Sequence, residues 1–239
     1  KIASFMKNRI AFLLAALFLM LAKPAFSQDN LCESGFMPFK EGTYFELTHY
    51  DKKGKPASIS KEKITGIEEI DGGFKATVDL ETTDEKGKTL TKGSFGMECK
   101  NGTIYMDMSS LMNPQSMAGM KDMEMEVSGS ALEIPRDLEP GSSLPDGTMT
   151  MKASTGGMTL MTLNFNVTNR KVEGRESVTT PSGTYDCIKV TSDTEMKAII
   201  KKKFKTATWF SKGFGMVKTE NYDDKGNVES SSMLTKFEQ

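Results

Sequence analysis

The chain has 239 residues, of which 26% are charged, and its 31 Lys and Arg against 32 Asp and Glu give a formal net charge of −1. This nearly balanced charge gives no reason to expect nucleic acid as a partner. A single histidine excludes multi-histidine metal sites and the two-histidine helix of zinc proteases.

The first 27 residues have the pattern of a secretory signal peptide. Lys7 and Arg9 form a basic region before the apolar run IAFLLAALFLMLA at 10–22, which is too short to span a bilayer comfortably as a helix. Ala25 and Ser27 fit the −3 and −1 positions of a cleavage site. We therefore expect cleavage before Gln28.

Met6 is the expected initiator, which would place the first five residues upstream of it. Without residues 1–27, which hold four basic and no acidic residues, the formal charge falls from −1 to −5. No later apolar stretch is long enough to span a membrane. The sequence thus predicts that residues 28–239 form a single β-rich domain without a transmembrane segment, exported to the periplasm or the cell exterior.

Glycine-containing turns punctuate this mature chain at short intervals. Between them lie runs in which apolar and polar residues alternate, such as TYFELTHY, KATVDLET, TLNFNVTN and YDCIKVTS. This period of two is typical of antiparallel strands with one buried face. The turns are DKKGK at 51, DGG at 71, DEKGK at 84, KNG at 100, PDG at 145, PSG at 181 and DDKGN at 223.

Three segments depart from this pattern. Asn113 as N-cap and Pro114 at the first helical position predict a short helix over about 114–121. The segment EMKAIIKKKFK at 195–205 fits either an amphipathic helical turn or a long hairpin, and the strands on both sides favour the hairpin. LEPGSSLPDG at 138–147 is a connector and a candidate seam between two halves.

Together these elements predict a mostly β protein. We expect one strongly curved antiparallel sheet of about 10 or 11 strands, a half-barrel, with the short helix lying against it. A closed lipocalin-like barrel and a β-sandwich are the alternatives.

Three cysteines remain in the mature chain. An oxidising compartment permits a disulfide, but the odd count leaves one thiol over. We favour a Cys32–Cys99 bridge, which would tie the N-terminal tail to a hairpin. Cys187 alternates with Tyr185 and has the pattern of a buried strand residue.

No catalytic machinery is recognisable. His49 lies in an early strand run without a partner suggested by sequence, there is no GxSxG motif, and we interpret it as a surface or edge-strand histidine. The acidic pairs are sequence neighbours, so their side chains point to different sides of a strand. We expect a non-enzyme without cofactor.

Methionine is the unusual feature of the composition. Twelve of the sixteen mature methionines lie between residues 97 and 161, and several come as M-x-M pairs, which place both side chains on one face of a strand. The predicted helix adds two more on one side. With nearby aromatic residues they could form one apolar wall, made of Met106, Met108, Met112, Met117, Met120, Met123, Met125, Met149, Met151, Phe165, Trp209 and Phe210.

Three interpretations of this wall remain open. Methionine can simply fill the core. It can also line a deformable pocket for a hydrophobic or lipid-like ligand, because it is unbranched and polarisable. Thioethers also suit copper(I), although no histidine lies near the cluster.

Two C-terminal stretches carry a family resemblance. TNRKVEGRESVTTPSGTYDCIKV at 168–190 and TWFSKGFGMVKTENYDDKGNVESSSMLTKF at 208–237 resemble the TapB-like family of exported envelope proteins, which is related to a domain of unknown function. The resemblance implies a β-rich fold, with a distant analogy to the curved half-barrels of LolA-like periplasmic carriers. It brings no catalytic residues.

The functional hypothesis that follows is an exported, non-catalytic β-protein that binds a hydrophobic ligand or partner segment in a Met-rich concavity. An interaction module of the cell envelope without a ligand is the alternative, and copper(I) binding is the third hypothesis. No protein partner can be named from the sequence.

Overall fold

The computed structural model describes residues 31–106, 123–198 and 200–239, with only the backbone described at Met125. These residues form β-strands and turns, with no helix among them. The strands are β1 (Tyr44–Asp51), β2 (Pro56–Ile70), β3 (Gly73–Asp84), β4 (Thr89–Lys100), β5 (Thr103–Met106), β6 (Glu124–Gly129), β7 (Leu132–Pro135), β8 (Gly147–Thr155), β9 (Met158–Thr180), β10 (Gly183–Lys197), β11 (Lys201–Ser211), β12 (Gly215–Tyr222) and β13 (Val228–Glu238).

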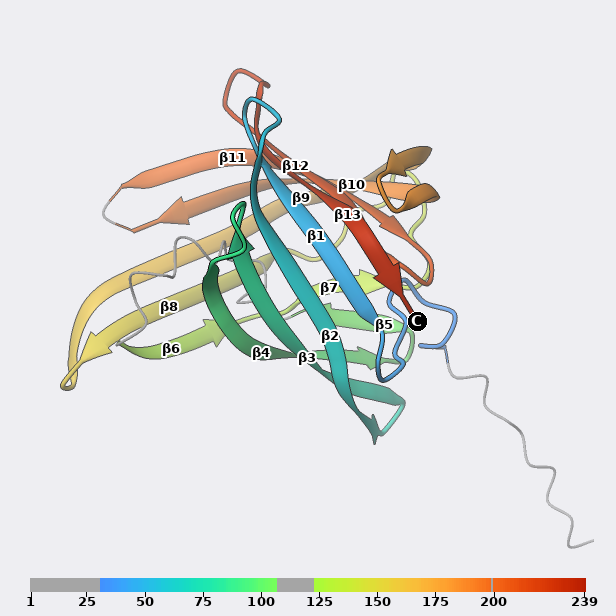
Figure 1. The fold of residues 1–239 in the computed structure, drawn as a ribbon, viewed down its shortest axis with the longest axis horizontal. Coiled ribbons are helices and arrows are strands. Elements are labelled where there is room, and N and C mark those ends of the chain that lie inside the picture. The colour runs from blue at the N-terminus through green and yellow to red at the C-terminus, as the bar shows by residue number, and fades with distance from the viewer. Residues whose placement is uncertain (1–30, 107–122, 199) are drawn as a thin grey trace, which may run out of the picture.

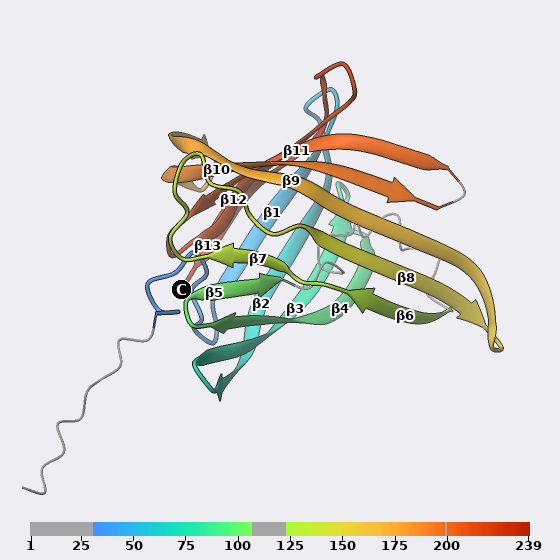
Figure 2. The same cartoon turned by 180° about the vertical axis from the view of Figure 1, so that it is seen from behind.

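All thirteen strands belong to one antiparallel sheet in the order β6-β8-β9-β10-β11-β12-β13-β1-β2-β3-β4-β5-β7. Most neighbours are consecutive hairpins, and the pairing of β13 with β1 joins the C-terminal to the N-terminal half. β6 and β7 follow each other in the chain but lie at opposite edges of the sheet. The sheet must therefore curl until its edges approach each other, as the ribbon shows (Figures 1 and 2).

The predicted single curved antiparallel sheet is confirmed, and it is not closed into a barrel or split into a sandwich. The expected 10 or 11 strands are too few. The short strands β5 and β7, each of four residues, lack a full alternating pattern, and only their pairing with each other and with β4 identifies them. The helix predicted over 114–121 lies outside the described residues.

The local turn chemistry explains three of the hairpins. In the turn between β1 and β2, Asp51 accepts backbone N–H bonds from Lys53 and Lys55 at 2.8 and 2.9 Å, and Gly54 takes a positive φ of 72°. The DEKGK and DDKGN turns repeat these contacts. The Asp side chain accepts hydrogen bonds from two backbone N–H groups, and the Gly adopts the left-handed conformation without strain. These local features stabilise the turn without contacts from the rest of the chain. The segment at 195–205 also forms a hairpin, as predicted.

The N-terminal segment packs inside one end of the curved sheet. Cys32 forms a disulfide with Cys99 of β4, with an S–S distance of 2.08 Å, as favoured from the sequence. Phe36 accepts a backbone hydrogen bond from Gly215 at 2.7 Å, and its ring meets Phe210 edge-on at 6.0 Å. This segment therefore completes the core at that end of the sheet.

The connector between β7 and β8 also contributes to the core. Leu138 and Leu144 are buried, and the buried Arg170 donates to the carbonyls of Pro145 and Glu133 at 2.7 and 2.9 Å. Within the described residues, no helix has the length and apolar character needed to cross a membrane.

Candidate functional site

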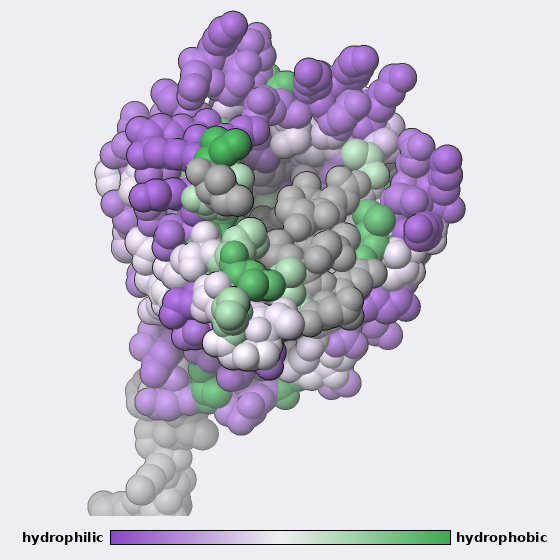
Figure 3. Space-filling model, turned by 90° about the vertical axis from the view of Figure 1, so that its left-hand side faces the viewer, coloured by the Kyte–Doolittle hydropathy of each residue, from purple (hydrophilic) through white to green (hydrophobic). Residues whose placement is uncertain are grey.

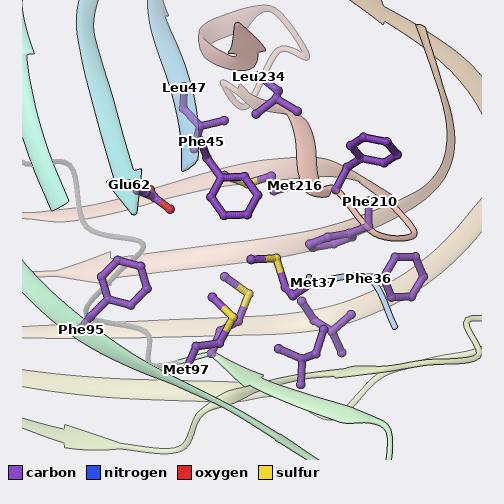
Figure 4. A pocket seen from close by; sticks show the side chains of 14 residues that line it. Phe36, Met37, Phe45, Leu47, Glu62, Phe95, Met97, Phe210, Met216 and Leu234 are labelled. Carbon is purple, nitrogen blue, oxygen red and sulfur yellow. The ribbon is translucent and has the colours of Figure 1, made fainter. Parts of the chain in front are cut away.

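An apolar pocket lies on the inner face of the sheet. It has a volume of about 60 Å³, and thirteen of its fourteen lining side chains are apolar or thioether groups (Figure 4). Eight strands, the N-terminal segment and the β11–β12 turn supply them. The pocket residues are Phe36, Met37, Phe45, Leu47, Glu62, Phe95, Met97, Ile104, Met106, Ile134, Phe210, Phe214, Met216 and Leu234.

Glu62 is the exception among the lining residues. It lies on β2 opposite Phe45, its side chain is half-buried, and its carboxyl points toward the cavity (Figure 4). No hydrogen bond or ion pair links this carboxyl to any of the described residues. Burial raises the pKa of Glu62 to about 7, because the apolar surroundings disfavour the charged form. A carboxyl held in this way is a candidate functional group.

Four methionines line the pocket. Met97 of β4 and Met106 of β5 are paired across the two strands, Met37 comes from the N-terminal segment and Met216 from β12. Unbranched thioether side chains change rotamer more readily than Leu, Ile or Val, so this wall can adapt in shape. Two residues of the predicted wall, Met106 and Phe210, are among the pocket residues.

Trp209 lies elsewhere, although it is adjacent to Phe210. Neighbouring strand residues point to opposite faces, so only one of the two can face the pocket. The Trp209 ring is buried, its Nε1–H donates to the Glu176 carboxylate, and the ammonium groups of Lys189 and Lys218 lie 4.9 and 4.7 Å from its centre. These cation–π contacts account for Trp209 structurally.

Other members of the predicted wall pack in a separate cluster at the β8 end of the sheet. Met149 is buried against Leu132, with Phe165 beside them, and Met151 has no exposed surface. Met123 is half-buried before β6 and is not a pocket residue. Met108, Met112, Met117 and Met120 lie outside the described residues, as does the side chain of Met125.

The sequence analysis missed Glu62 and three of the four pocket methionines. On β2, the inward-pointing side chains are those of Ser58, Ser60, Glu62 and Ile64. The apolar Ile59 points to the other side, so the sequence of β2 does not show which face is buried. Met37 and Met216 lie outside the methionine-rich region, and only the tertiary fold brings them to the pocket.

His49 is on a central strand, between β13 and β2, so its interpretation as an edge-strand residue is wrong, and its side chain is half-buried. Its Nδ1 lies 2.7 Å from Ser232 Oγ and its Nε2 lies 2.8 Å from Ser60 Oγ, which in turn lies 3.0 Å from Thr82 Oγ1. Both ring nitrogens are thus occupied by hydroxyls, so no carboxylate orients the ring as in a catalytic triad. Burial lowers the pKa of His49 from its usual value.

The remaining thiol and the acidic groups offer no second reactive centre. Cys187 is buried and unpaired, and burial raises the pKa of its thiol to about 11, so the nucleophilic thiolate is disfavoured. Within the described part of the chain, no three His, Cys, Asp or Glu side chains come together in an arrangement that could hold a metal ion.

A larger groove of about 660 Å³ lies between β3–β4 and the β6–β7 link. Its lining mixes charged, polar and apolar groups, including Met149 and an ion pair between Lys75 and Glu98 at 3.6 Å. We regard the smaller pocket as the candidate site, because it is more enclosed and holds the unpaired Glu62 carboxyl.

Two solved structures share this architecture. The chain resembles a crystal structure from Bacteroides fragilis, classed as an exported protein with a YmcC-like fold, with a TM-score of 0.75 and 23% identity over 86% of this chain and 100% of that one. It also resembles a protein of Parabacteroides distasonis classed as a lipoprotein, with a TM-score of 0.75 and 21% identity over 86% of this chain and 99% of that one. At these identities the likeness shows the fold alone. No curated protein matches the sequence.

These comparisons do not confirm the resemblance to TapB-like proteins or the analogy to LolA. The family relationship rests on a model described as DUF3108-like, which matches residues 40–234 and so most of the chain. The chain belongs to the DUF3108-like family.

Proposed function

We propose that this chain is an exported, non-catalytic binding protein that takes the apolar part of a small amphiphilic ligand into the Glu62 pocket. The observation that carries the proposal is one carboxyl, unpaired among the described residues, in a wall of thirteen apolar and thioether side chains. Burial of a polar group without a hydrogen-bond partner costs stability, and a bound ligand could supply that partner. A few placed polar groups in an otherwise apolar pocket are typical of small-molecule sites.

The size of the pocket limits the ligand. A volume of about 60 Å³ is well below the roughly 150 Å³ of a cavity that binds benzene. The wall must therefore yield on binding, and the four methionines are the side chains that yield most readily. The pocket suits the end of an alkyl chain better than a whole lipid.

Glu62 determines which polar group such a ligand carries. With its pKa at about 7, the carboxyl is partly ionised at neutral pH and can accept a hydrogen bond from an amine or hydroxyl. A ligand carboxylate would be repelled by the ionised form. We therefore favour an alkyl amine or alcohol over a fatty acid.

The test is displacement of the neutral dye N-phenyl-1-naphthylamine by octylamine, octanol and octanoate. We expect octylamine to compete best and octanoate worst, with Glu62→Gln weakening octylamine about tenfold, as expected for loss of a charge-assisted hydrogen bond. Phe210→Ala should weaken dye binding, whereas Phe165→Ala, outside the pocket, serves as its matched control. No dye uptake, together with an empty protein in native mass spectrometry, would overturn the proposal and favour an interaction module without a ligand.

Copper(I) is the second candidate, because four thioether groups and one carboxylate line the same pocket. A competition titration against a chromogenic copper(I) chelator tests it. Binding tighter than about micromolar that is lost in Met97→Leu/Met106→Leu supports a copper site, and weaker binding removes it.

A further inference from the structure

Among the described residues, the most exposed large apolar side chains lie at the tips of two long hairpins. Ile200, in the β10–β11 turn, is 78% exposed, and Met158 and Leu160, beside the β8–β9 turn, are 68% and 56% exposed. Both tips project from the same end of the molecule, on the left in Figure 1 and on the right in Figure 2. Nothing in the core requires apolar residues at these positions.

Positive charge is concentrated in one of these two hairpins. The β10–β11 tip over 195–205 carries five lysines and one glutamate. The β8–β9 tip is mainly apolar and polar, and its nearest basic residue, Lys152, pairs with Glu126 of β6 at 3.4 Å. Because the whole chain carries a net charge of −1, this end is electrostatically distinct from the rest.

A space-filling view of this end shows hydrophobic side chains near a hollow, with hydrophilic side chains around them (Figure 3). The lysines on β11 are well exposed, with Lys201 and Lys203 side chains 51% and 63% accessible, and both share the carboxylate of Glu195 at 2.8 and 3.7 Å. Lys197, at the same tip, forms no ion pair with any of the described residues.

We propose that the tips of the β8–β9 and β10–β11 hairpins form a docking surface for an anionic lipid bilayer. Met158, Leu160 and Ile200 enter the boundary between headgroups and acyl chains, while the neighbouring lysines contact the lipid phosphates. Exposed apolar side chains combined with basic residues bind such membranes through apolar burial and electrostatic attraction. An acidic protein surface could also bind the lysines, but it would not explain why three large apolar side chains are exposed at these two tips.

The strand register determines the angle at which a bilayer can contact both tips. Lys197 at the end of β10 pairs with Asn164, so β9 continues six residues further to Met158, roughly 20 Å of strand. The β8–β9 tip therefore projects beyond the β10–β11 tip. A flat bilayer that touches both must run at an angle to β9.

Vesicle flotation tests the proposal on the chain from Gln28, which retains all thirteen strands and lacks the apolar N-terminal run. We expect the protein to float with phosphatidylcholine vesicles that contain phosphatidylglycerol, much less with phosphatidylcholine alone, and less at high salt. Met158→Ser/Leu160→Ser/Ile200→Ser should weaken binding at least about tenfold. Leu31→Ser, an exposed apolar position at the opposite end, should leave it unchanged.

A second variant and its matched control test how much the lysines contribute to vesicle binding. Lys197→Gln/Lys201→Gln/Lys203→Gln should reduce binding to anionic vesicles, whereas Lys52→Gln/Lys53→Gln/Lys55→Gln in the β1–β2 turn should not. A Met158→Trp variant gives a direct readout of insertion, because Trp209 is the only native tryptophan and is buried. Its emission should shift to the blue when anionic vesicles are added.

Three results would overturn the proposal. They are absence of binding to anionic vesicles at low salt, equal binding by the serine triple variant, and no spectral shift in Met158→Trp. Binding to soluble polyanions that matches vesicle binding and survives the serine substitutions would identify a polyanion site instead. Ligand displacement from the Glu62 pocket is measured without vesicles, so the two proposals fail independently.

Discussion

Phe45 of β1 and Glu62 of β2 are directly paired across their strands, and both side chains line the apolar pocket. A phenyl ring and a carboxyl thus share one largely apolar surface. The carboxyl cannot be both ionised and well solvated there, which is why its pKa rises to about 7.

The first prediction concerns the pH dependence of stability. The pKa of Glu62 is higher in the folded state than its ordinary value of 4.5, so the folded state binds more protons between about pH 4.5 and 7, and stability falls as pH rises through that range. Glu62→Gln should remove this loss and raise the free energy of unfolding at about pH 8 by on the order of 3 kcal/mol. Urea denaturation at acidic and alkaline pH measures it.

The exposed Glu68 on the same strand provides the control for this measurement. Glu68→Gln should leave the pH dependence of the wild type in place. If Glu62→Gln and Glu68→Gln give the same pH profile, Glu62 is solvated in solution.

The second prediction concerns His49, whose two ring nitrogens bind Ser232 and Ser60. His49→Leu removes both of these hydrogen bonds, leaving Ser60 only its contact with Thr82, and should destabilise the protein by about 1–3 kcal/mol. Since burial lowers the pKa of His49, the unfolded state binds the extra proton, and the wild type should lose stability as pH falls below 6.5. His49→Gln, which does not titrate, should lack that part of the loss.

The contribution of His49 can be measured separately from that of Glu62. In the Glu62→Gln background, the pH dependence between about 5 and 6.5 should come chiefly from His49. A double variant with His49→Gln that keeps the full acid loss would contradict this assignment.

The third prediction concerns the Cys32–Cys99 disulfide, which closes a loop with a sequence separation of 67. Its removal in Cys32→Ser/Cys99→Ser should cost about 4 kcal/mol on the chain-entropy model. Because Phe36 and Met37 follow Cys32 closely and line the pocket, dye binding should weaken as well. Thermal unfolding and dye titration with and without reductant measure both effects, and the variant itself should not respond to reductant.

The fourth prediction separates backbone strain from a packing contact. Gly213 and Gly215 have similar positive φ angles of 77° and 76°, but only at Gly215 would an added Cβ meet a side chain, the Sδ of Met37. Gly213→Ala should cost about 1–2 kcal/mol from strain alone, and Gly215→Ala should cost more. Denaturant unfolding of both variants gives the difference.

Met37→Ala tests the cause of that difference. In its background, the added Cβ of Gly215→Ala has room, so the two glycine substitutions should become nearly equal in cost. An undiminished gap would show that the Met37 contact is not responsible.

Local patterns in the sequence were sufficient for the sheet and its turns. Alternation over TYFELTHY or YDCIKVTS predicts a strand wherever the chain folds, because it depends only on a period of two. The DKKGK, DEKGK and DDKGN turns close with their own Asp and Gly. The Cys32–Cys99 pairing was also favoured, since the strand pattern left Cys187 as a buried residue.

The pocket could not be predicted from local sequence patterns. Met37, Met97 and Met216 come from segments far apart in the chain, and they meet because β13 pairs with β1 and the sheet curls. For the same reason the dense methionine region proved a poor guide: Met149 packs in a second cluster, Met151 is buried but does not line the pocket, and Phe210 and Trp209, one residue apart, face opposite sides. The period of each strand is a property of its own residues, but which faces converge, and that Glu62 lies among apolar side chains, follows from long-range pairing and curvature.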